Sequence, residues 1–270
     1  IDLVEGIVEN APDKFAIATS WQQIEQQFNQ GLISLPLGME NGAPIAGDLN
    51  NLIHFYNRGI RYITLTHSLS NHIADSSYDD NRPAGGLTNF GKSLITEMNN
   101  LGMMIDISHV SDDAFWDAVT LSKAPIIASH SSARAFTPKF ERNMSDEMIK
   151  ALAKQGGVIF INFGSTFLTQ ESNDSYELRK KGGFKYAHLN DVLNHIDHVR
   201  DIAGIDAIGI GSDYDGVGDT LPEGLKDVSA YPALIEGLLD RGYTEQQIEK
   251  ITWGNLKRVW QQVDAYAASH

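Results

Sequence analysis

Short apolar runs alternate with longer amphipathic segments along most of the chain. From about residue 31 onward, a run rich in β-branched residues is followed by a polar turn and then by apolar positions at helical spacing. The runs that predict buried strands are Leu32–Met39, Tyr62–Thr66, Met103–Ser108, Pro125–Ser129, Gly157–Asn162 and Ala207–Gly211. The segments that predict helices cover residues 48–58, 88–101, 111–122, 146–155, 189–203, 229–240 and 244–263.

Several predicted helices begin with clear capping residues. Ser111, Ser145 and Thr244 each precede a helical segment and are followed by acidic or amide side chains in its first turn. The strands lack strict alternation of apolar and polar residues, which is typical of parallel strands buried on both faces. Alternation of strands with helices predicts βαβ units.

The fold class expected from this order is α/β, as an open doubly wound sheet or a closed (β/α)8 barrel of the TIM type. No Gly-x-Gly-x-x-Gly follows a first strand. A barrel needs about eight strands, and only six can be counted. Residues 1–30 look helical and polar, so we expect the first two strands of a barrel to lie outside them. We expect one domain over residues 1–270.

Composition excludes several classes of function. With 21 Lys and Arg against 35 Asp and Glu, the formal net charge is −14, which disfavours binding to nucleic acid or anionic lipid. The absence of cysteine excludes disulfides, thiolate nucleophiles and Cys-ligated zinc. Apolar stretches such as Val158–Ile161 are too short to span a membrane.

The chain begins at Ile1 rather than Met, so we expect that residues upstream have been removed. This start favours an exported, periplasmic protein, while a cytoplasmic location stays open.

Ionisable side chains recur where the predicted strands end. They are Glu40, His67, His109, His130 and Asp213. A single histidine is usually a hydrogen-bonded structural residue, and a single Asp after a strand is usually a helix cap. In a barrel, however, the carboxyl ends of all strands face one mouth, so the recurrence predicts a shared site. A divalent cation is the usual partner of converging imidazole and carboxylate groups.

The types of ligand favour Zn²⁺, with Mn²⁺, Fe²⁺ and Co²⁺ as alternatives. Such a metal lowers the pKa of its bound water to about 7. A carboxylate such as Glu40 can bridge two ions about 3.5–4 Å apart. Asp213 would then orient or deprotonate the water, and His67 could donate to a developing oxyanion.

Other polar residues have two interpretations. Arg142 is either a surface ion-pair partner or a bidentate clamp for a substrate carboxylate, and Arg134 is a weaker candidate for that clamp. His195 and Asp197 form a His-x-Asp pair, but helical geometry predicts that they face different directions. The remaining histidines that we expect at the surface or in packing are His54, His72, His188 and His270.

The motifs together resemble the membrane (renal) dipeptidases, peptidase family M19, in order and over nearly the whole chain. The segments that carry the resemblance are Tyr62–His67, Ile105–Ser111, Ser129–Ala133, Arg142-Asn143, Gly211–Gly216 and Asn255-Leu256. The resemblance implies a (β/α)8 barrel with a binuclear zinc site that hydrolyses dipeptides, often with a D-residue on the C-terminal side.

The resemblance also implies the zinc ligands. Glu40 is the bridging ligand, and His109 and His130 hold the second zinc. The family usually has Glu-Gly-Gly where this chain has Glu40-Asn41-Gly42. Its first strand ends in a His-x-Asp that binds the first zinc, and no counterpart precedes Glu40. We therefore expect the first strands to be missing from this chain. Their absence would leave an open sheet edge and a first metal site that lacks two of its ligands.

For catalysis, the resemblance implies that His67 stabilises the tetrahedral intermediate, that Arg142 binds the free carboxylate of the substrate, and that Asp213 handles the water and the substrate amine. Two alternatives stay open. One is another barrel amidohydrolase that acts on a cyclic amide or lactone, and the other is a non-catalytic relative with a degraded metal site. The sequence also leaves open a homodimer, the preferred dipeptide and the native metal.

Overall fold

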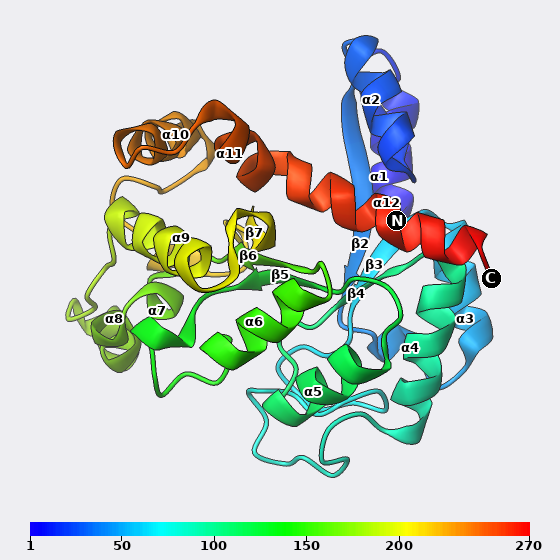
Figure 1. The fold of residues 1–270 in the computed structure, drawn as a ribbon, viewed down its shortest axis with the longest axis horizontal. Helices are drawn as coiled ribbons and strands as arrows, with labels where there is room; N and C mark the ends of the chain where they lie inside the picture. The colour runs from blue at the N-terminus through cyan, green and yellow to red at the C-terminus, as the bar shows by residue number, and fades with distance from the viewer. The chain divides into compact units, whose positions relative to one another are not determined.

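The computed structural model describes all residues from 1 to 270, and they form two compact units. The first comprises Ile1–Pro125 and Lys257–His270, and the second comprises Ile126–Leu256. Figure 1 shows the ribbon. We describe each unit by itself, and the single-domain organisation stays a prediction. No helix in the chain is both long and apolar enough to cross a membrane.

The first unit is built on four parallel strands in the order β1-β2-β3-β4. The strands are β1 (Phe15–Ala18), β2 (Ile33–Glu40), β3 (Ile60–Thr64) and β4 (Met104–Asp106). The helices are α1 (Asp2–Asn10), α2 (Trp21–Asn29), α3 (Leu49–Asn57), α4 (Asn89–Leu101), α5 (Asp112–Leu121) and the part of α12 (Asn255–Ala268) from Lys257 onward. Its fully buried core includes Ile63, Leu65, Met98, Phe115 and Trp260.

The second unit contains three parallel strands in the order β5-β6-β7. They are β5 (Ile127–Ser131), β6 (Val158–Ile161) and β7 (Ile208–Ile210). The helices are α6 (Asp146–Lys154), α7 (Ser165–Leu168), α8 (Gln170–Asp174), α9 (Leu189–Ala203), α10 (Tyr231–Asp240) and α11 (Glu245–Glu249), followed by a π-helical turn over Lys250–Gly254. Within this unit α9 packs against α6, α10 and β6.

The α/β class and all six predicted strands are confirmed, with ends shifted by up to two residues. The predicted caps are also confirmed, since Ser111, Ser145 and Thr244 each accept a hydrogen bond from a backbone N–H in the first turn of the helix that follows.

The expectation that residues 1–30 contain no strand was wrong, because β1 lies between α1 and α2. The chain therefore has seven strands, one fewer than the eight of a complete barrel. β1 pairs only with β2, and Phe28 and Ile33 near it are largely exposed.

Candidate metal centre

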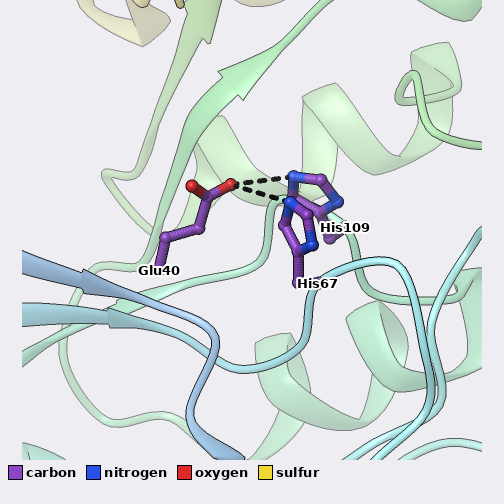
Figure 2. A group of neighbouring side chains, drawn as sticks. All are labelled: Glu40, His67 and His109. Carbon is purple, nitrogen blue, oxygen red and sulfur yellow. Dashed lines mark ion pairs between the residues drawn. The ribbon is translucent and has the colours of Figure 1, made fainter. Parts of the chain in front are cut away.

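Three of the predicted site residues lie together in the first unit. The carboxylate oxygen Oε1 of Glu40 is 3.1 Å from Nε2 of His109 and 3.6 Å from Nε2 of His67. Figure 2 shows both imidazole rings turned toward this one oxygen. The ring centroids of the two histidines are 4.4 Å apart. All three potential ligand atoms lie within 4.8 Å of one another, so one cation could contact them all.

Strand register explains why these residues meet. Glu40 pairs with Thr64, and Thr64 pairs with Asp106, so the last residues of β2, β3 and β4 form one row. His67 and His109 each follow three residues after the end of their strand. The hydroxyl of Thr64 donates to the buried carboxylate of Asp106 at 2.5 Å, which joins the ends of β3 and β4.

The loop after β3 fixes the backbone of both histidines. The hydroxyl of Ser76 donates to the carbonyl of His67 at 2.5 Å and to that of His109 at 3.3 Å, and the backbone N–H of Ser77 donates to His109 at 2.8 Å. The buried carboxylate of Asp75 accepts from the N–H of Gly86 and so closes the loop. His109 is held at φ +71, a conformation that costs a non-glycine residue free energy and that persists only when its surroundings impose it.

The residue after Glu40 explains the departure from Glu-Gly-Gly. Asn41 has φ +81, in the left-handed region that glycine adopts most readily. Asparagine is among the few other residues that tolerate this region. Its side-chain oxygen also accepts from the N–H of Ala43 at 3.1 Å and from the amide of Asn71 at 3.2 Å. Asn41 therefore adopts the left-handed conformation of this turn without being a glycine.

The chemistry of the donors fits a divalent transition metal. One carboxylate and two imidazoles, with no thiolate, suit Zn²⁺ and its first-row neighbours. The side chain of His109 is 8% exposed, whereas those of Glu40 and His67 are 48% and 46% exposed. A cation at this place would thus be held from the buried side by His109 and would still be reached by water or substrate.

His130 and Arg142 lie together in the second unit. The guanidinium group of Arg142 donates from Nη1 to the hydroxyl of Ser131 at 2.6 Å and from Nη2 to the carbonyl of His130 at 2.7 Å. Nδ1 of His130 is 2.7 Å from the hydroxyl of Ser129. Arg142 is only 3% exposed, so it does not lie at the surface. The interpretation of Arg142 as a clamp for a substrate carboxylate stays a prediction.

Asp213 also belongs to the second unit, where it follows β7. Its carboxylate oxygen Oδ2 accepts a hydrogen bond from the side-chain amide of Asn162 at 2.8 Å. Asn162 follows β6 directly and was not a candidate in the sequence analysis, because an amide carries no charge and is not a preferred zinc ligand. Its position at the end of a strand is the same signal that singled out the five ionisable residues.

The prediction that His195 and Asp197 face different directions is confirmed. His195 is fully buried, with Nδ1 accepting from the N–H of Ala133 and Nε2 donating to the carbonyl of Leu168, both at 3.0 Å. Asp197 instead binds Arg241 at 2.6 Å. The pair is therefore no metal motif.

His195 should make the protein sensitive to acid. Burial, with a smaller contribution from nearby His198, lowers the pKa of its imidazole from 6.5 to about 4, and the hydrogen bond to the carbonyl of Leu168 opposes this change. Between these two pKa values the unfolded chain binds more protons than the native one. The contribution of His195 to the free energy of unfolding is therefore fully present above about pH 6.5. It is lost as the pH falls toward about 4, by ~3 kcal/mol in total. Denaturant unfolding of His195→Gln over this range should show a shallower pH dependence, whereas the exposed control His54→Gln should match the wild type.

The other basic residues have structural partners. Arg134 donates to the carbonyls of Glu141 and Asn143 and so braces the segment that carries Arg142. His72 packs against Phe90, with ring centroids 5.2 Å apart. These contacts explain their presence without a role in binding substrate.

Comparison with known protein families shows to which family the chain belongs. The profile of the Membrane dipeptidase family (Peptidase family M19) matches residues 1–270. The chain belongs to this family. The M19 family consists of metallopeptidases, which agrees with a cluster of one carboxylate and two imidazoles at the strand ends.

Solved structures share the fold of this M19 chain. The probable dipeptidase PvdM from Pseudomonas aeruginosa is 28% identical, with a TM-score of 0.90 over 98% of this chain and 78% of that protein. A metallo peptidase from Rhodobacter sphaeroides, bound to a phosphinate mimic of the dipeptide L-Ala-D-Ala, is 29% identical, with a TM-score of 0.85 over 97% of this chain and 72% of that protein.

A more distant match extends the likeness of fold beyond the family. An amidohydrolase from Burkholderia multivorans is 13% identical, with a TM-score of 0.54 over 97% of this chain and 88% of that protein. This match concerns the fold alone. Together with the seven parallel strands, it establishes the TIM-like α/β fold of the amidohydrolases for the M19 chain.

Proposed function

We propose that this M19 chain is a zinc-dependent dipeptidase, which hydrolyses the peptide bond of a dipeptide with a metal-activated water. The observation that carries the proposal is the cluster of Glu40, His67 and His109 at adjacent strand ends in a member of a metallopeptidase family. The Rhodobacter sphaeroides relative, which binds a mimic of L-Ala-D-Ala, supports a dipeptide with a D-residue at its C-terminal side as the substrate class.

Glu40, His109 and His130 are the residues that we propose to hold the metal, with Glu40 as the ligand that two ions would share. No histidine precedes Glu40 in this chain, so the His-x-Asp that the resemblance implies for a first zinc has no counterpart among residues 1–39. When bound, zinc lowers the pKa of water to about 7 and polarises a carbonyl group.

The remaining polar residues act on the substrate. Arg142 binds its free carboxylate, because a guanidinium group pairs with a carboxylate through parallel hydrogen bonds. His67 donates from Nε2 to the oxyanion of the tetrahedral intermediate. Asp213 accepts the proton of the attacking water, passes it to the leaving nitrogen and holds the amino group of the substrate. Half exposure of His67 suits this role, since its ring can reach a bound substrate.

A panel of substrates tests the proposal. The purified full-length protein should hydrolyse dipeptides, lose this activity when a chelator removes the metal, and regain it when Zn²⁺ is added back. Longer peptides and simple lactones should react at least about 100-fold more slowly, because they lack a carboxylate at the right distance from the scissile bond. Turnover of a lactone or cyclic amide in preference to every dipeptide would instead favour a different amidohydrolase. Absence of bound metal after growth with zinc would favour a non-catalytic relative.

A further inference from the structure

The backbone of Asp213 is held in an unfavourable conformation. Its φ is +56, in the left-handed region that few non-glycine residues adopt. Its carbonyl accepts hydrogen bonds from the N–H groups of Gly216 at 3.1 Å and Val217 at 3.3 Å, so the turn that follows imposes this conformation. Strain of this kind persists only where the surroundings fix the residue, and it is concentrated at functional sites.

The same turn leaves room for the carboxylate. A Cβ atom added to Gly216 would lie 2.0 Å from Oδ1 of Asp213. No side chain other than hydrogen is therefore tolerated at position 216 while Asp213 keeps its rotamer. The glycine is required here for close approach, since Gly216 itself does not have a positive φ.

Asn162 holds the other oxygen of the carboxylate. Its Nδ2 donates to Oδ2 of Asp213 at 2.8 Å, and its Oδ1 accepts from the N–H of Gly164 at 2.6 Å. A backbone N–H can only donate, so the oxygen of the amide must face Gly164 and the NH₂ group must face Asp213. The orientation of the Asn162 side chain is thus decided by its hydrogen bonds.

The backbone of Asn162 is anchored as well. Its carbonyl accepts from the hydroxyl of Ser132 at 3.1 Å, and its N–H donates to the carbonyl of Ser131 at 3.3 Å. Ser131 also accepts the hydrogen bond from Arg142. Asn162 is fully buried, so it lies away from solvent and its amide is a rigid donor.

We propose that Asn162 is a positioning residue for Asp213: its amide fixes the carboxylate in one rotamer, against the bare backbone of Gly216. The inference deepens the proposed function, on which it rests for the task of Asp213. A base must be correctly placed before it can accept a proton from water, and a fixed donor on one of its oxygens meets this need. Asn162 acts only through Asp213 and contributes no proton itself.

The first test replaces Asn162 with aspartate. Asn162→Asp keeps the size of the side chain and an oxygen for the N–H of Gly164, but it turns the donor toward Asp213 into an acceptor. We expect kcat/KM for a dipeptide to fall by roughly 10- to 100-fold, since Asp213 acts on both the attacking water and the amino group of the substrate. The acidic limb of the pH–kcat profile should move to higher pH, because two carboxyl groups in contact resist double ionisation.

A readout that does not need catalysis follows the carboxyl groups directly. NMR of isotope-labelled aspartate should show one carboxyl resonance that is lost in Asp213→Asn and that titrates at higher pH in Asn162→Asp than in the wild type. Tyr214 and Asp215, the titratable groups next to Asp213 in the chain, are the same in both proteins. The difference therefore reports the contact with residue 162.

A matched control and a second variant separate positioning from folding. Asn99 is a buried amide of the first unit that bonds to Ser122 and to the N–H of Lys123. Asn99→Asp should lower the melting temperature without changing the pH profile. Gly216→Ala should act on the carboxylate from its opposite side, so we expect it to lower kcat/KM at unchanged Zn²⁺ content. This second variant decides the question if Asn162→Asp does not fold.

The outcomes distinguish this inference from the proposed function. A shifted aspartate titration in Asn162→Asp supports the inference even if the wild type hydrolyses no dipeptide. Absence of dipeptide hydrolysis by the wild type would refute only the proposed function. An unchanged titration, or dipeptide kinetics of Asn162→Asp and Gly216→Ala that equal those of the wild type, would overturn the inference while leaving the dipeptidase proposal intact.

Discussion

Replacing His109 with alanine is expected to remove the bound metal and to lower kcat/KM for a dipeptide by about 1,000-fold or more. The reason is that hydroxide becomes scarce when the pKa of the attacking water returns from about 7 toward about 15.7. His109 is the least exposed member of the cluster and the closest to Glu40, at 3.1 Å. Its loss therefore removes the donor that holds a cation from the buried side. Metal content by elemental analysis and dipeptide kinetics on the same sample measure both effects.

His67→Ala is the matched comparison, because His67 faces the same oxygen of Glu40 at 3.6 Å. As a donor to the oxyanion rather than a ligand, it should leave metal content unchanged and lower kcat by about 100- to 1,000-fold. Equal loss of metal in both variants would show that His67 is a ligand and would contradict its proposed role. Retention of metal and activity in His109→Ala would contradict the metal centre itself.

The positions of the strands could be predicted from the sequence because apolar runs such as Val158–Ile161 are buried on all sides. β1 could not, since Phe15–Ala18 has only four residues and only Ala18 is buried. A short, half-exposed strand depends on pairing with β2 rather than on its own pattern. That pairing is tertiary and leaves no trace in local periodicity.

The ionisable members of the site were visible in the sequence because parallel strands bring their carboxyl ends to one edge. This reasoning placed Glu40, His67 and His109 together, and the structure confirms that they meet. It could not show that Ser76, from the loop after β3, binds both histidine carbonyls. The positive φ of His109 depends on such contacts and is likewise absent from any local pattern.

The hydrogen bonds of uncharged supporting residues were the part that the sequence could not predict. Asn162 and His195 each form hydrogen bonds to residues far away in the chain, at 51 and 62 positions. Their importance comes from their partners: Asn162 bonds to the carboxylate of Asp213, and His195 bonds to the backbone of Ala133. A buried amide or neutral imidazole has many structural uses, so only the partner identifies its role.

The second large effect concerns Arg142 and the free carboxylate of the substrate. Arg142 is buried and rigidly held by Ser131 and the carbonyl of His130, which preorganises its guanidinium group for a planar anion. We expect the wild type to hydrolyse a dipeptide about 100-fold or more faster, in kcat/KM, than the same dipeptide with an amide in place of its C-terminal carboxylate. Loss of one partner of a buried charged pair costs about 2–5 kcal/mol.

Arg142→Ala should abolish this preference, so that acid and amide are hydrolysed at similar rates. Because the variant also loses the bonds to Ser131 and His130, its overall activity will fall for structural reasons as well, and only the ratio between the two substrates isolates the clamp. Arg134→Ala is the matched control, since Arg134 donates to the backbone carbonyls of Asn143 and Glu141 and contacts Met148. It should slow both substrates equally and keep the ratio of the wild type. A ratio that survives in Arg142→Ala would contradict the clamp, because the discrimination would then come from another cation.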